Sequence, residues 1–97
     1  MRVIAKRTLR EFWEEHLDAE DSLKSWFAET EDASWQNPAD VKARYGSASI
    51  LKDNRVVFDI CGNKYRLVVK INYKAAIVLI RFIDTHRQYD GINAEVI

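Results

Sequence analysis

Five side chains in the second half of the chain could together carry out chemistry on a phosphate: Arg66, Arg81, His86, Tyr89 and Asp90. Arginine binds phosphate through two parallel N–H groups and stays charged at every physiological pH. Histidine titrates near neutral pH, so His86 could transfer a proton, and Asp90 could orient it. Tyr89 could stack on a base or donate a second proton. These residue types predict a site that binds a phosphate and moves protons.

Basic side chains are concentrated in the same half of the chain. Residues 1–48 contain seven Lys and Arg against ten Asp and Glu, a net charge of −3. Residues 49–97 contain eight against five, a net charge of +3. This asymmetry favours contact with a polyanion. We expect Arg55, Lys64 and Lys70 to provide further contacts to RNA.

Residues 55–90 predict three antiparallel strands and a short polar tail. Gly62-Asn63 lies between two runs of β-branched and aromatic residues, which is typical of a two-residue hairpin loop. The loop fixes the cross-strand pairs, which are Ile60–Tyr65, Asp59–Arg66 and Phe58–Leu67.

The second turn is predicted at Tyr73-Lys74. A two-residue loop there would place Arg66 opposite Arg81, with Leu67 opposite Ile80 and Tyr65 opposite Phe82. Like charges opposite each other destabilise a sheet by up to roughly 1 kcal/mol. The register therefore predicts an anion bound between the two arginines.

Alternation along the strands predicts two different faces of the sheet. One is apolar and requires a cover; its members are Val56, Phe58, Ile60, Tyr65, Leu67, Val69, Val78, Ile80 and Phe82. The other is mixed; its members are Asp59, Lys64, Arg66, Lys70, Arg81, Val57, Val68, Leu79 and Ile83. A mixed face is also what simple solvation of a sheet produces, and Asp59 with Arg66 could be an ordinary structural ion pair.

Helices in the first half could cover the apolar face. Thr8 and Glu11 form a capping box for a helix to about Leu17, and Asp18 could cap a second helix to about Glu29. Asn37-Pro38 predicts the start of a third helix. Residues 1–5 are expected to form an edge strand. We expect the inner faces of the first two helices, including Phe12, Trp13, Leu23 and Trp26, to pack on the sheet.

The predicted fold class is α+β: a small, mainly antiparallel sheet with the amino-terminal helices on one face. Ninety-seven residues with 47% hydrophobic side chains are expected to form a single domain, 1–97. The only cysteine is Cys61, so no internal disulfide can form, which fits a reducing cytoplasm. No membrane span or signal peptide is recognisable, and no metal or other cofactor is expected.

Three stretches in order resemble the HigB family of bacterial toxins, which belong to type II toxin–antitoxin modules. They are Val57 to Val69 (VFDICGNKYRLVV), Ile80-Arg81, and Thr85 to Asp90 (THRQYD). Asp59 and Cys61 stand where the family pattern has Asn and Gly, and neither change removes a catalytic group. The helical first half also resembles the family in length and layout.

The resemblance implies a RelE-like fold with the active site on the sheet face away from the helices. It implies a metal-independent endoribonuclease that cuts mRNA, typically on the translating ribosome, and so inhibits translation. It also implies a HigA-like antitoxin with a helix-turn-helix domain as the partner. The residues that match the family's motifs are Arg66, Arg81, His86, Tyr89 and Asp90.

Two other classes of function remain open from the sequence. Toxins of the same broad fold can inhibit DNA gyrase by binding alone, and the arginines would then contact a protein. A plain interaction domain could instead bind a peptide at its sheet edge. The expected position of Arg66, Arg81 and His86 on one rim of the sheet favours the nuclease over these two alternatives.

Overall fold

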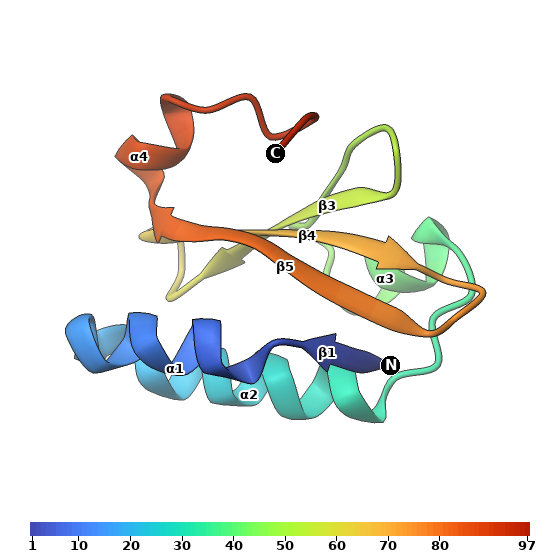
Figure 1. The fold of residues 1–97 in the computed structure, drawn as a ribbon, viewed down its shortest axis with the longest axis horizontal. Helices are drawn as coiled ribbons and strands as arrows, with labels where there is room; N and C mark the ends of the chain where they lie inside the picture. The colour runs from blue at the N-terminus through green and yellow to red at the C-terminus, as the bar shows by residue number, and fades with distance from the viewer.

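The computed structural model describes residues 1–97 and confirms the α+β class. Its elements are β1 (Arg2–Ile4), α1 (Lys6–Glu15), the 3-10 turn η1 (Leu17–Ala19), α2 (Glu20–Asp32), α3 (Pro38–Arg44), β2 (Ser49–Ile50), β3 (Arg55–Ile60), β4 (Tyr65–Asn72), β5 (Ile77–Thr85) and α4 (His86–Asp90). The sheet has the order β1-β5-β4-β3-β2, with β1 parallel to β5 and the other neighbours antiparallel. Helices α1 and α2 lie along one face of it, whereas α4 and the carboxyl-terminal segment lie over the other (Figure 1). None of the helices is both long enough and apolar enough to cross a membrane.

The main core lies between the two long helices and the sheet, as predicted. Leu9, Trp13 and Leu23 are buried there with Phe58 and Leu67. Burial of each such side chain contributes about 1.5–3 kcal/mol. The aromatic members that also pack in this core are Phe12, Trp26, Trp35 and Tyr65.

Only one of the three predicted helix caps is correct. The Asn37 side chain accepts a hydrogen bond from the Asp40 amide at 3.0 Å, with Pro38 in the first turn. Helix α1 instead begins at Lys6, so Thr8 lies inside it and caps nothing. Asp18 does not cap α2 either, because its carboxylate binds side chains of the distant β3–β4 hairpin.

The first hairpin has the predicted register, and the second does not. Asp59 pairs with Arg66 as expected. The β4–β5 connection, however, has four residues, since Asn72 pairs with Ile77. The Asn72 side chain accepts a hydrogen bond from the Ala75 amide at 3.0 Å, which stabilises this longer turn. Arg66 therefore lies opposite Asp84, and the predicted Arg66–Arg81 pair is wrong.

A β-bulge changes the faces of the second half of β5. Val69 pairs with Ile80 and Val68 pairs with Phe82, so Arg81 is an extra residue in β5. Such an insertion moves the following side chains to the opposite face. Phe82 consequently packs on the face away from the helices, and Ile83 packs against the main core. The predicted positions of these two side chains are thus reversed.

Candidate functional site

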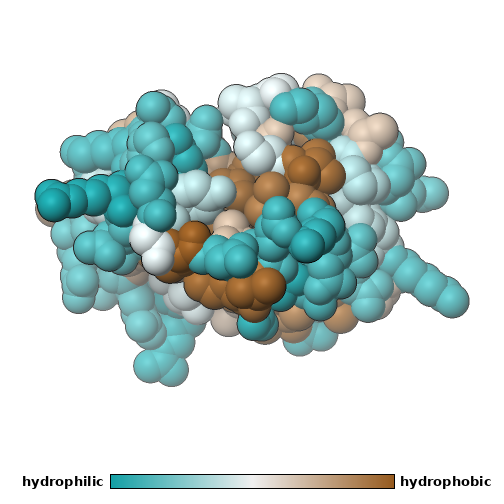
Figure 2. Space-filling view, turned by 90° about the horizontal axis from the view of Figure 1, so that it is seen from above, coloured by the Kyte–Doolittle hydropathy of each residue, from teal (hydrophilic) through white to brown (hydrophobic).

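The sheet face away from the helices has an apolar centre. Val57, Val68 and Ala94 are buried there, and Phe82 and Tyr89 pack against them. Ala94 belongs to the segment after α4, which returns across the sheet. Figure 2 shows apolar surface in the middle of this side of the molecule, bordered by hydrophilic side chains. Tyr89 is the candidate site residue that packs directly on this centre.

Three cationic side chains line one pocket on this face: Arg55, Lys70 and Arg81. Arg55 is 6% exposed, and its Nε donates to the main-chain oxygen of Ile97 at 2.9 Å. Nε of the exposed Arg81 donates to the same oxygen at 3.3 Å. The side chains of Arg55 and Lys70 lower the pKa of Asp53, which lies 2.7 Å and 3.5 Å from them. Asp53 contacts two of the three cations that line the pocket, which leaves an excess of positive charge suited to phosphate.

Arg66 occupies a different part of the face and is held by its neighbours. Its Nε lies 3.3 Å from Asp59 Oδ1, and its two terminal nitrogens donate to Asn63 Oδ1 at 2.6 Å and to the Asn63 main-chain oxygen at 3.2 Å. The side chain is 11% exposed. Arg81 lies at the bulge, two to three positions further along the sheet, or roughly 7–10 Å. The two arginines thus share a face but do not face each other, so the reason for expecting an anion between them is removed.

Helix α4 presents His86 at the end of the sheet. Thr85 caps the helix by accepting a hydrogen bond from the Gln88 amide at 3.1 Å, and the His86 amide donates to the Lys64 main-chain oxygen at 3.1 Å. Nε2 of His86 lies 3.5 Å from Asp90 Oδ1, and both side chains are accessible to solvent. The predicted orientation of His86 by Asp90 is compatible with this geometry.

Tyr89 lies beside the apolar centre of the sheet face, whereas Lys64 is directed away from it. The Tyr89 ring lies 6.5 Å from that of Phe82, between α4 and the apolar centre. The Lys64 ammonium forms an ion pair with Asp18 of η1. That contact raises the pKa of Lys64 and lowers the pKa of Asp18. Lys64 is therefore directed toward η1 and not, as predicted, toward the mixed face.

Sequence reasoning missed the segment after α4. Residues 91–97 are too few for their sequence to predict a helix or a strand, yet Ala94 is 7% exposed and the Ile97 oxygen accepts hydrogen bonds from two arginines. The only feature of the sequence that could have indicated this packing is that Ala94 and Ile97 are hydrophobic. No group of three or more His, Cys, Asp and Glu side chains is arranged to hold a metal ion.

One comparison with known proteins identifies the family. The model of the HigB toxin family, described as the RelE-like toxic component of a toxin–antitoxin system, matches residues 19–92. This range includes β3, β4, β5 and α4, and thus every candidate site residue. Among curated proteins, no sequence gives a significant match. The chain therefore belongs to the HigB family of RelE-like toxins.

Proposed function

We propose that this toxin is a metal-independent endoribonuclease that cuts mRNA on the translating ribosome. Its partner would be a HigA-like helix-turn-helix antitoxin, and its place of action the cytoplasm. The observation that supports the proposal is the shared face. Arg55 and Arg81 of the cationic pocket donate to the Ile97 oxygen, and α4 carries the His86–Asp90 pair beside Tyr89; Ile97 and Tyr89 both pack on the same apolar centre. The cationic pocket suits the RNA backbone, and the His86–Asp90 pair suits proton transfer.

The positions of these groups suggest a division of roles. Arg81 precedes His86 by five positions, which in an extended strand is roughly 16 Å. We therefore assign the phosphate that is cut to the end of the sheet at His86, near Arg66. Lys70 and Arg81 would bind neighbouring phosphates and hold the RNA in place, and the buried Arg55 would add its charge to the pocket.

The reaction would be attack of a ribose 2′-OH on the adjacent phosphorus. His86, oriented by Asp90, would accept the 2′ proton as the new P–O bond forms. The bond to the 5′ oxygen breaks, and that oxygen receives a proton, for which Tyr89 is the assigned donor. The products are a 2′,3′-cyclic phosphate and a 5′-OH. Arg66 would stabilise the negative charge of the transition state.

The test is cleavage of a translated reporter mRNA by purified variants, followed by primer extension. His86→Gln should lower the rate by about a hundredfold or more, because glutamine cannot carry a proton near neutral pH. Arg81→Ala should weaken cleavage as well, most clearly at low toxin concentration. The control is Arg10→Ala on α1, which removes an exposed arginine from the other side of the molecule.

Two results would contradict the proposal. Folded His86→Gln and Arg81→Ala proteins that cut at the wild-type rate would exclude the assigned site. Intact transcripts with DNA supercoiling defects after induction of the wild type would replace the nuclease with a gyrase inhibitor.

A further inference from the structure

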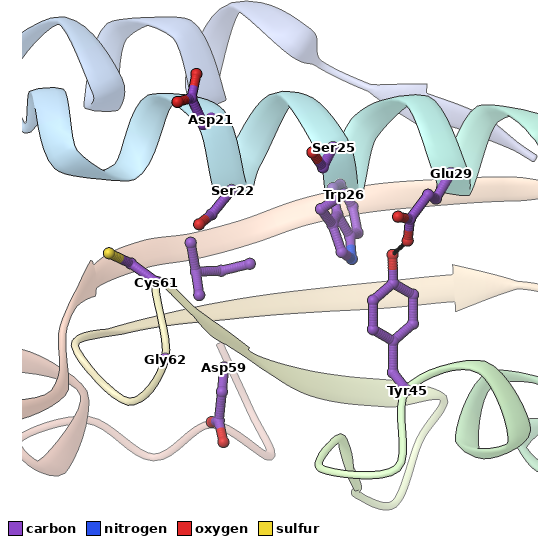
Figure 3. Close-up of a pocket in the computed structure, with 10 residues that line it drawn as sticks. Asp21, Ser22, Ser25, Trp26, Glu29, Tyr45, Asp59, Cys61 and Gly62 are labelled. Atoms are coloured by element: carbon purple, nitrogen blue, oxygen red, sulfur yellow. Dashed lines mark hydrogen bonds between the residues drawn. The ribbon is translucent and has the colours of Figure 1, made fainter.

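A second pocket lies on another side of the molecule, between α2 and the outer edge of β3. Its α2 wall includes Asp21, Ser25 and Trp26, and Tyr45 closes one end. The opposite wall is the last part of β3 and the start of the following turn, residues 59–62. In Figure 3, Ser22 and Trp26 point from α2 toward the strands, while Asp21 lies on the outer rim of the helix. Of the mixed-face residues, only Asp59, whose carboxylate pairs with Arg66, also lines this pocket.

The strand that borders the pocket has an open edge. The short strand β2 pairs only with Val56 and Val57, so Phe58–Ile60 have β4 on one side and no strand on the other. The Leu51 amide donates to the Arg55 oxygen, which places that oxygen on the β2 side of β3. Because these directions alternate, the N–H and C=O of Asp59 point into the open edge. An unpaired edge of this kind can accept a strand from another protein.

A buried hydrogen-bond donor in the pocket has no partner. Nε1 of Trp26 makes no hydrogen bond, although the residue is only 2% exposed. Figure 3 shows its indole projecting from α2 into the space above the strands. Unpaired buried donors are rare in folded proteins because each forfeits its hydrogen bonds to water. A main-chain oxygen brought in by a partner would satisfy this one.

The α2 side of the pocket is acidic. Helix α2 contains five Asp and Glu residues and a single Lys. Glu29 already binds Arg44 and the Tyr45 hydroxyl. Asp21, by contrast, is exposed and has no cation within ion-pair distance. The rim therefore favours a partner that carries a positive charge beside Asp21.

We propose that this groove binds a basic, extended segment of a partner protein, which adds a short strand to β3 and places a Lys or Arg side chain beside Asp21. The partner that the toxin family implies is the antitoxin. The inference rests on that partner and not on ribonuclease activity. It assigns the antitoxin segment to a surface that meets the proposed RNA site only at Asp59, the ion-pair partner of Arg66.

The first experiment measures the affinity of the purified toxin for its co-expressed antitoxin by calorimetry. Asp21→Lys should weaken binding by about three- to tenfold, because a favourable contact becomes a repulsive one. Asp32→Lys is the matched control, since it makes the same change on α2 outside the groove; its effect should stay below about twofold. Cleavage of reporter mRNA by Asp21→Lys without antitoxin should equal that of wild type. This readout separates a failure of the groove from a failure of the proposed nuclease.

The second experiment is amide and indole NMR of the free toxin and of the complex. Hydrogen exchange at the Asp59 amide should slow in the complex, and the indole N–H resonance of Trp26 should shift. Equal affinity of the Asp21→Lys and wild-type proteins, together with unchanged exchange at Asp59, would overturn the proposal. Protection of Asp59 in a concentrated sample of toxin alone would assign the edge to a second copy of the chain, and would overturn it too.

Discussion

Replacing each of the two strand arginines by alanine should reduce the stability of the fold by clearly different amounts. Arg66 is 11% exposed, pairs with Asp59 and donates two hydrogen bonds to Asn63. These bonds connect β4 to the turn that precedes it. Their loss leaves a half-buried carboxylate without its cation, and we expect Arg66→Ala to reduce the free energy of unfolding by about 2 kcal/mol. For a domain of this size, that corresponds to a fall in melting temperature of roughly 8–16 °C.

Arg81→Ala should have a much smaller effect on stability. Arg81 is exposed, and its only polar contact is a hydrogen bond of 3.3 Å to the Ile97 oxygen. Loss of such a contact costs up to about 1 kcal/mol. Urea denaturation followed by circular dichroism measures both values, and Arg66→Lys, which keeps the charge but loses the planar fork, should be intermediate. Equal losses of stability in Arg66→Ala and Arg81→Ala would refute this account of the two positions.

Two further changes test the contacts around the sheet. The ion pair with Lys64 lowers the pKa of Asp18 below its ordinary value of 3.8. The stabilising effect of this ion pair is therefore fully present above about pH 4, and it is lost as the pH falls through the lowered pKa. Asp18→Asn should accordingly lose less stability than wild type between pH 7 and pH 3 in urea unfolding; a parallel loss would exclude this contribution. Ala94→Asp should detach the segment after α4 and reduce the free energy of unfolding by about 1–2 kcal/mol, whereas the same change at the exposed Val96 should cost under about 0.5 kcal/mol. Limited proteolysis should then cut the segment faster in Ala94→Asp, and equal rates in both variants would contradict the packing.

The parts of the fold that depend on local sequence could be predicted. Gly62-Asn63 is a strong hairpin signal, and Gly62 does adopt a φ of +68°, so the β3–β4 register follows from the turn. Asn37-Pro38 fixes the start of α3 for the same kind of reason. Helical spacing of large apolar residues was enough to predict which surface of α1 and α2 is buried.

The parts of the fold that depend on contacts between distant residues could not be predicted from the sequence. Asp18 is a good capping residue by type, but Lys64 and the Tyr65 hydroxyl, far along the chain, offer its carboxylate charged and neutral donors. The length of the second turn depends on the Asn72 side chain, which a preference for two-residue loops ignores. Sequence patterns also carry no signal for a bulge, because both Phe82 and Ile83 are apolar and either could face the core.

The bulge that reversed the predicted faces also explains how the candidate site is built. With a regular β5, Phe82 would enter the main core, and Tyr89 would lose its support on the mixed face. The extra residue instead turns Phe82 toward Val68, where it supports α4. It also leaves Arg81 without a cross-strand partner, so its side chain is free to meet the Ile97 oxygen or a phosphate. Bulges next to functional sites commonly redirect a side chain in this way. The same irregularity thus positions both the cationic pocket and the helix that carries His86.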